Sequence, residues 1–306
     1  MTITSAPFDH ESAGAGPDAA AFWVKAADGV RLRMGAMARG DKGTILIVPG
    51  RTEYLEKYGY IAEDFAAHGY GSVCMDVRGQ GLSDRLIKDP VIGHVNRFAD
   101  YQTDMSALVA FAEAQGFARP WVLLGHSMGG KVAMQLALLA PDRIDRVIVA
   151  DISPVAYKPR HDAIMEGLKA MDLSAVSSRT EADRQMANFV DDAGVRQFLL
   201  KNLERVPKDQ AVEGGPVFRW LLNLATIEHC YSQLTDAPQG EGPFDGPVLF
   251  IKGADSAYLQ SKHKDIILKL FPNASIKVIE GTGHWLHAEK PDTFATLCVD
   301  FLATDD

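Results

Sequence analysis

The sequence predicts an α/β fold, with a mostly parallel sheet of eight strands flanked by helices and a helical segment inserted before the last two strands. Short apolar runs alternate with helix-forming stretches at both ends of the chain. Strands that alternate with helices form right-handed units of a parallel sheet. Between residues 153 and 245 the alternation stops. A chain of 306 residues with 47% hydrophobic residues is large enough for one domain of this class.

The first part of the chain is expected to contain a disordered N-terminal segment, a hairpin and a central strand. Residues 1–20 are rich in Ala, Gly, Ser and Asp and are expected to be disordered. The apolar runs 22–25 and 30–34 flank an Asp-Gly pair, which is typical of a tight hairpin turn. Thr44–Val48 is a continuous apolar and β-branched run, as in a buried strand at the middle of a sheet.

The remaining strands and helices follow in alternation. The apolar runs predict strands at 72–75, 121–124, 147–151, 248–252 and 275–279. The stretches around them predict five helices. Two span residues 98–115 and 131–140, two end near residue 68 and at residue 271, and one begins at residue 291. Together with the hairpin and the central strand, these runs make up the eight strands of the predicted sheet.

The stretch from 153 to 245 is expected to form a helical cap on one domain. Its apolar residues recur at helical spacing in four segments: 162–171, 181–190, 195–202 and 217–224. Residues 21–152 and 246–306 then form the α/β core. A cap over the carboxyl ends of the parallel strands lies where such folds bind ligands, so it is expected to shape a substrate pocket.

The segment Gly125–Gly129 fits the pattern G-x-S-x-G, in which a serine stands on a sharp turn between a strand and a helix. The context agrees, because the apolar run Trp121–Leu124 precedes it and helix-forming residues follow it up to Pro141. Glycines on either side of the serine remove side chains that would clash where strand and helix crowd together. Ser127 is therefore the predicted nucleophile.

Composition and cysteine usage narrow the functional class. The formal net charge is −9 and no basic cluster is present, which argues against nucleic-acid binding. The cysteines, Cys74, Cys230 and Cys298, are odd in number and widely spaced, which fits neither a disulfide framework nor a zinc site. No signal peptide or membrane-spanning run is visible. We expect a cytoplasmic protein that acts on a small molecule, without cofactor, metal or integral membrane association.

A nucleophilic serine needs a base, and the base needs a carboxylate that orients it. Among nine histidines, His284 is the best candidate for the base, because it follows the last predicted strand in a glycine-rich loop. His287 is expected at the surface or behind the reacting groups. Asp151 and Asp255 both end strands close to the predicted elbow strand. Both give the chain order Ser, Asp, His, so position alone leaves either as the acid.

Six motifs carry a family resemblance. Three in the first part of the chain look like the lysophospholipase L2 and monoacylglycerol lipase group: 49–58, 78–84 and 93–101. Three from the elbow onward look like the YbfF and abhydrolase-11 esterases: 150–155, 197–202 and 281–291. The chain therefore resembles the α/β-hydrolase superfamily over nearly its whole length after residue 20. Because its two halves resemble different relatives, a hybrid of two proteins is one hypothesis.

The resemblance to the second group favours Asp151 as the acid. In those esterases the acid ends the earlier strand within a D-[IA]-[SA]-P-V stretch, which Asp151–Val155 matches. In the lysophospholipase-like group the acid closes a G-x-x-D pattern after the later strand, but Gly253–Ser256 carries a serine at that place. The resemblance therefore implies Asp151, with Asp255 as the alternative acid.

The resemblance also implies an oxyanion hole and a function. One backbone N–H donor is that of Met128, next to the nucleophile; the other is that of Arg51, in a loop where Pro49 replaces the histidine of relatives. The implied function is a serine esterase that cleaves short-to-medium acyl esters through an acyl-enzyme on Ser127. Lysophospholipase, monoacylglycerol lipase or acyl thioesterase activity is one alternative. A non-catalytic or poorly active scaffold is another.

Overall fold

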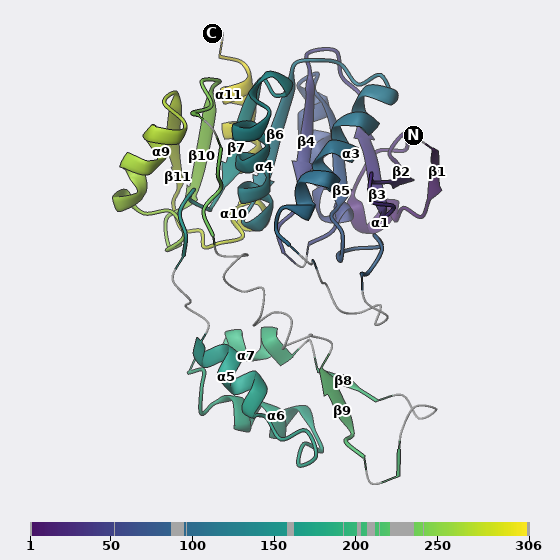
Figure 1. Cartoon of the computed structure of the whole chain (residues 1–306), viewed down its shortest axis with the longest axis vertical. Coiled ribbons are helices and arrows are strands. Elements are labelled where there is room, and N and C mark those ends of the chain that lie inside the picture. The colour runs from purple at the N-terminus through teal and green to yellow at the C-terminus, as the bar shows by residue number, and fades with distance from the viewer. Residues whose placement is uncertain are drawn as a thin grey trace.

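A central nine-stranded sheet organises the molecule and runs in the order β1-β2-β3-β5-β4-β6-β7-β10-β11 (Figure 1). The computed structural model describes residues 2–51, 53–86, 95, 97–157, 162–191, 193–200, 203–206, 212–213, 215–220, 236–240 and 242–304. Neighbouring strands are parallel from β5 to β11. They are antiparallel from β1 to β5. The predicted α/β class with a mostly parallel sheet is confirmed.

The strands at the middle of the sheet are fully buried. The strand bounds are β1 Ile3–Ala6, β2 Ala20–Lys25, β3 Arg31–Ala38, β4 Thr44–Val48, β5 Gly71–Asp76, β6 Trp121–His126, β7 Arg146–Ala150, β10 Val248–Gly253 and β11 Ala274–Ile279. In β4, Ile45 and Ile47 join the hydrophobic cluster on one face, and Leu46 and Val48 join the cluster on the other. A continuous apolar run is thus the pattern of a strand that is covered on both faces.

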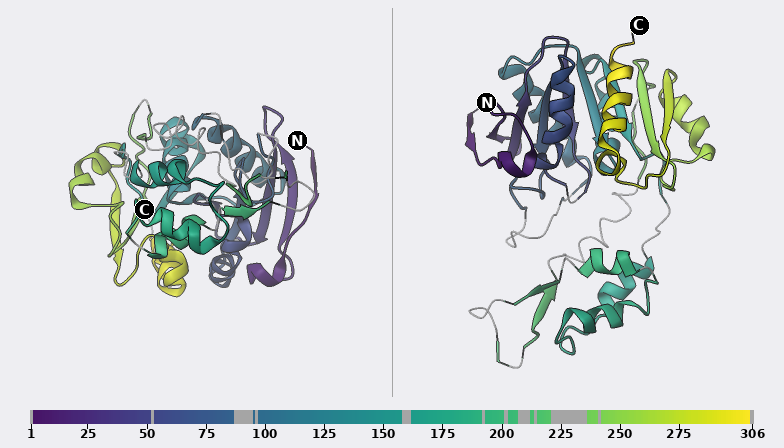
Figure 2. Two further views of the ribbon diagram at one scale, coloured as in Figure 1. Left: turned by 90° about the horizontal axis from the view of Figure 1, so that it is seen from below. Right: turned by 180° about the vertical axis from the view of Figure 1, so that it is seen from behind.

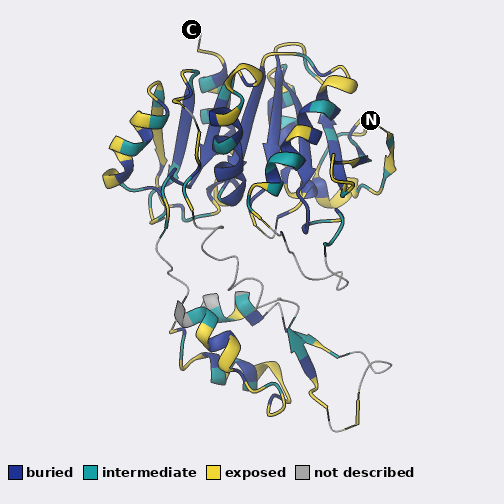
Figure 3. Ribbon diagram, viewed as in Figure 1, coloured by how far each residue is buried: buried dark blue, intermediate teal, exposed yellow. Residues whose placement is uncertain are grey.

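Helices cover both faces of this sheet. Their bounds are η1 Leu55–Tyr58, α2 Gly59–Ala67, α3 Asp100–Ala114, α4 Met128–Leu139, η2 Pro141–Arg143, η3 Ser261–His263, α9 Lys264–Leu270, α10 Leu286–Glu289 and α11 Pro291–Leu302. Figures 1 and 2 show α3, α4 and α9 on one face and α2 and α11 on the other. Their outer sides are exposed, whereas the strands at the middle of the sheet are buried (Figure 3). Within the described residues, none of the helices combines the length and apolar character needed to cross a bilayer.

The N-terminal segment is folded where the sequence predicts disorder over residues 1–20. β1 pairs antiparallel with β2 and adds a ninth strand to the predicted eight, and a short helix, α1 (His10–Ala13), follows it. The Arg33 side chain fixes the connection by donating a hydrogen bond to the Pro7 carbonyl over 3.1 Å. The prediction of disorder is wrong for the described residues, because main-chain pairing with a sheet edge does not require the apolar side chains that composition measures.

The helices and strands described between β7 and β10 form a small body with its own core. It consists of α5 Asp162–Ala170, α6 Arg179–Met186, α7 Ala193–Leu200, and the antiparallel pair β8 Leu203–Arg205 and β9 Phe218–Trp220. Its buried side chains, among them Leu168, Met186 and Leu203, form a cluster separate from the two clusters of the sheet. Figures 1 and 2 place this body beyond the carboxyl ends of the parallel strands.

One predicted helix in this body is a strand. Of the segment 217–224, Phe218–Trp220 forms β9, and 221–224 lies outside the described residues. β9 pairs with β8, and Arg219 forms an ion pair with Glu204 across the two strands over 2.7 Å. Helical periodicity does not reveal this pairing, because it joins segments that are separated along the chain.

Candidate active site

Ser127 stands on a sharp turn between β6 and α4. Its backbone takes φ 52° and ψ −118°, a conformation that residues with a side chain rarely adopt. A Cβ atom on Gly125 would lie 2.4 Å from the Gly129 carbonyl oxygen, and one on Gly129 would lie 2.1 Å from the Val48 oxygen. The two glycines therefore allow strand and helix to pack closely around a serine that remains only half-buried.

His284 contacts both Ser127 and Asp151. Its Nε2 lies 2.9 Å from Ser127 Oγ, and its Nδ1 lies 2.7 Å from Asp151 Oδ2. The carboxylate beside Nδ1 favours the tautomer with the proton on Nδ1, so that Nε2 presents a lone pair to the serine hydroxyl. Three residues that are far apart in the sequence thus form one hydrogen-bonded row.

Asp151 directly follows β7 and is fully buried. Its backbone has a φ of 49°. Its Oδ1 accepts a hydrogen bond from the Gly253 N–H over 3.2 Å, and its Oδ2 accepts one from Ser256 Oγ in addition to its contact with His284. Since a buried carboxylate is costly without partners, these donors stabilise Asp151 where it faces the imidazole.

Asp255, the alternative acid, lies apart from this row. It is exposed, and its N–H donates a hydrogen bond to the Thr282 carbonyl over 3.0 Å. In the described parts of the chain its carboxylate makes no hydrogen bond or ion pair with His284. The next residue, Ser256, is the one that reaches the row, through its hydrogen bond to Asp151.

The two residues predicted to supply oxyanion donors follow β6 and β4, which are adjacent parallel strands. Met128 is the first residue of α4, and no atom of the described residues accepts a hydrogen bond from its N–H. Arg51 lies in the loop after β4 and is exposed. The Gly50 N–H in this loop donates to Glu53 Oε2 over 2.6 Å, and the Gly50 carbonyl accepts from Gln80 over 3.1 Å. These bonds fix the loop next to Arg51.

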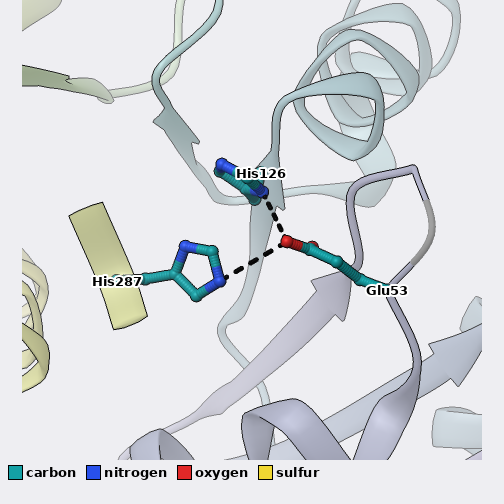
Figure 4. A group of neighbouring side chains, drawn as sticks. All are labelled: Glu53, His126 and His287. Atoms are coloured by element: carbon teal, nitrogen blue, oxygen red, sulfur yellow. Dashed lines mark ion pairs between the residues drawn. The ribbon is translucent and has the colours of Figure 1, made fainter. Parts of the chain in front are cut away.

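A second group of polar side chains adjoins the row and consists of Glu53, His126 and His287 (Figure 4). Glu53 Oε1 lies 3.0 Å from Nδ1 of His126 and 3.6 Å from Nε2 of His287. All three residues are buried: Glu53 is 2% exposed, His126 is 1% exposed and His287 is 5% exposed. The His126 Nε2–H donates to the main-chain carbonyl of His284 over 2.8 Å, which connects this group to the row.

The sequence did not single out Glu53, and it left His287 with two possible places, at the surface or behind the reacting groups. The His287 ring is buried and stacks on Tyr58, with ring centroids 5.4 Å apart and planes at 5°. One signal for Glu53 was present: it follows a buried parallel strand, and polar groups at the carboxyl ends of such strands converge on the site. His94, another histidine near the N-terminal motifs, lies outside the described residues.

Burial and close neighbours set the protonation of Glu53 and His287. Burial acts to raise the pKa of Glu53, but the nearby His126, His287 and Tyr58 hydroxyl outweigh it and lower that pKa to about 2. Burial, reinforced by His126, lowers the pKa of His287 to about 3. At neutral pH, Glu53 is therefore a carboxylate and His287 is a neutral imidazole.

Family comparison agrees with this fold. The sequence profile of the family described as "Serine aminopeptidase, S33", a family of α/β hydrolases, matches residues 40–291. The chain belongs to this family. The prediction of the α/β-hydrolase superfamily is thus confirmed.

Individual relatives include esterases and lipases. The mouse protein named sn-1-specific diacylglycerol lipase ABHD11 is 42% identical over 190 residues, which cover 60% of this chain and 59% of the mouse protein. Esterase YbfF of Escherichia coli is 34% identical over 258 residues, which cover 84% of this chain and 92% of YbfF. A solved structure named "Marine microorganism esterase" is 30% identical with a TM-score of 0.66 and covers 89% of this chain and 98% of that one. The resemblance to the second group of esterases is confirmed, and the hybrid origin remains a hypothesis.

Proposed function

We propose that this protein is a serine hydrolase that cleaves carboxylic esters with short-to-medium acyl chains through an acyl-enzyme on Ser127. One observation carries the proposal: the hydrogen-bonded row from Ser127 through His284 to Asp151, with distances of 2.9 and 2.7 Å. A hydroxyl, an imidazole and a carboxylate in this order make a serine nucleophilic. The names of the relatives, esterase and lipase, support the class of substrate.

The first half-reaction forms the acyl-enzyme. Ser127 Oγ attacks the acyl carbon while His284 Nε2 takes the hydroxyl proton, and the Asp151 carboxylate stabilises the imidazolium that results. The Met128 and Arg51 N–H groups are proposed to bind the oxyanion of the tetrahedral intermediate. His284 then gives its proton to the departing alkoxide, so an alcohol leaves and an ester bond to Ser127 remains.

The second half-reaction releases the acid. Water takes the place of the alcohol, His284 accepts its proton, and the hydroxide oxygen attacks the acyl carbon on Ser127. When the second intermediate collapses, the proton returns to Ser127 Oγ and the free carboxylic acid departs. Apart from the substrate and water, the protein supplies every group in this cycle, so no cofactor is part of the proposal.

The acyl-chain preference is proposed to come from the cap, residues 153–245. The elements from α5 to β9 in this region have their own hydrophobic core beyond the strand ends. A lipid ester is the second candidate substrate, because the mouse relative is named a diacylglycerol lipase, although the match spans only about three-fifths of that protein. A small acyl ester and a lipid ester would differ most in chain length.

A chain-length series of 4-nitrophenyl esters tests the proposal. We expect turnover to be highest for short-to-medium chains, and Ser127→Ala to lower kcat by about 10⁴-fold or more. A fluorophosphonate probe should label Ser127, identified by peptide mass. Ser106→Ala, at an exposed serine of α3, is the matched control and should retain full activity. An unlabelled, inactive but folded protein would instead establish a non-catalytic scaffold, and activity on long-chain lipid esters alone would exclude the chain-length proposal.

A further inference from the structure

We propose that Glu53, His126 and His287 form a binding site for a divalent transition-metal ion of the zinc class. Two imidazoles and one carboxylate are a frequent ligand set for such ions in proteins. The sequence offers no zinc spacing for these residues, because each comes from a different segment: the loop after β4, the end of β6, and α10. None of the three side chains takes part in the proposed ester hydrolysis, although His126 contacts the main-chain carbonyl of His284.

The distances between the three ligand atoms suit one ion. Glu53 Oε1, His126 Nδ1 and His287 Nε2 all lie within 4.8 Å of one another. The carboxylate oxygen is 3.0 Å from one nitrogen and 3.6 Å from the other, and the side chains converge from three sides in Figure 4. An ion with tetrahedral bonds of about 2.0–2.2 Å places its ligand atoms ~3.4 Å apart, which is close to both distances from the carboxylate oxygen.

The contacts of His126 also point to a cation. Its Nε2 must carry a proton, because it donates to the His284 carbonyl. When Nε2 carries the only ring proton, Nδ1 directs a lone pair into the group. Although Nδ1 is only 3.0 Å from Glu53 Oε1, it forms no hydrogen bond with any of the described residues. A buried lone pair beside a carboxylate is unfavourable, and a metal ion bound by both atoms would remove the repulsion.

Surrounding groups hold Glu53 and His126 in the orientation that a metal requires. Glu53 Oε2 accepts hydrogen bonds from the Gly50 N–H and the Tyr58 hydroxyl, both over 2.6 Å, which leaves Oε1 for the ion. The His284 carbonyl fixes the His126 tautomer in the same way, as outer partners of metal-bound histidines commonly do. A Cβ atom on Gly50 would lie 2.7 Å from His126 Nδ1, so a glycine keeps this side of the site open.

Burial of the carboxylate favours a bound cation. One bound dication would neutralise the charge of Glu53, which is 2% exposed. Since the ligands come from three segments, the ion would connect them and stabilise the folded state.

The test is a titration of chelator-treated, folded protein with Zn²⁺, followed by isothermal calorimetry and by thermal unfolding. We expect one zinc per chain and a rise in Tm. Glu53→Gln keeps the size of the side chain and an oxygen for Gly50 and Tyr58, but it should weaken zinc binding by about 10- to 100-fold or more. With Co²⁺ in place of zinc, a visible spectrum should report nitrogen and oxygen ligation in the native chain and disappear in His287→Gln.

Glu56→Gln is the matched control, because Glu56 is another buried carboxylate in the same segment but pairs with Arg33 over 2.7 Å. It should bind zinc as the native chain does. Equal zinc affinity in Glu53→Gln would place the ion elsewhere and overturn the proposal. Failure of the folded native chain to bind zinc would also overturn the proposal. NMR of ¹⁵N-labelled histidine should then show protons on both His126 ring nitrogens, because a proton would occupy the place assigned to the metal.

Discussion

Ser256 Oγ donates a hydrogen bond to Asp151 Oδ2, the oxygen that also lies 2.7 Å from His284 Nδ1. The two residues follow β10 and β7, which are adjacent parallel strands. One strand thus supplies the carboxylate and its neighbour supplies a donor that holds it. This division accounts for a serine at the place where the lysophospholipase-like group carries an acid.

Ser256→Ala should lower kcat for ester hydrolysis by about tenfold with little change in KM, because a hydrogen bond to a charged group contributes ~1.5 kcal/mol. The imidazole should remain in place, since Asp151 still has the Gly253 N–H as a partner. Steady-state kinetics on one 4-nitrophenyl ester measure this change. Ser261→Ala, at a nearby exposed serine, serves as the control. An unchanged kcat in Ser256→Ala would show that the hydrogen bond does not position the carboxylate.

Asp151→Asn and Asp255→Asn should differ greatly in activity. An amide at 151 cannot stabilise the imidazolium of His284 and favours the wrong tautomer, which costs about 10⁴-fold in kcat in a triad of this kind. The same change at the exposed Asp255 should leave kcat within about twofold. Both variants are compared at equal folded concentration, checked by circular dichroism. A larger loss in Asp255→Asn would transfer the role of the acid to that residue.

Gly129→Ala should destabilise the fold by several kcal/mol, because the new Cβ would lie 2.1 Å from the Val48 carbonyl oxygen in a packed strand end. Urea unfolding monitored by tryptophan fluorescence gives the change in free energy. Gly242→Ala is the control, since a Cβ there meets no atom within 4 Å. Equal stability of the two variants would mean that strand and helix can move apart at the elbow without cost.

Lys131 connects α4 to both ends of the proposed cap. It is 3% exposed, and its Nζ donates to the main-chain oxygens of Val155 and Asp236 over 3.1 and 2.5 Å. Burial lowers its pKa from 10.5 to about 8. Between these two values the unfolded chain binds more protons at this position than the folded chain, so folding stability should increase as the pH rises from about 8 toward 10.5.

The variant Lys131→Met should remove this increase. We expect the free energy of unfolding of the native chain to rise relative to the variant across that range, by at most ~3 kcal/mol. Urea unfolding at a series of pH values measures the difference, and Lys42→Met, at an exposed lysine, should follow the native chain. Parallel curves for the native chain and Lys131→Met would show that Lys131 has the same pKa folded and unfolded.

The sequence was informative wherever a local pattern reports on burial or on backbone strain. The run Thr44–Val48 predicted a central strand because both of its faces are apolar, and the glycines around Ser127 predicted the elbow because only they fit the close approach. Asp151 could not be chosen by position, since Asp255 also follows a neighbouring strand. The resemblance to known esterases was needed to prefer it.

The remaining features depend on contacts between distant segments. Neither β1 nor β9 has a strong side-chain pattern. Each forms because its main chain pairs with another strand, β1 with β2 and β9 with β8. Glu53 and His287 are 234 positions apart, and only the packing of the loop after β4 against α10 brings them within 3.6 Å. A charged residue in a loop is usually solvated, and composition alone gives no reason to expect it inside.

β1 has a further consequence for the behaviour of the molecule. It covers the outer side of β2 through four paired positions, from Ile3 with Val24 to Ala6 with Ala21. A chain that started after this strand would expose a row of unsatisfied main-chain donors and acceptors, which can recruit a strand from another copy. Loss of a few residues remote from the reacting serine would thus favour self-association at high protein concentration while leaving the chemistry of the site intact.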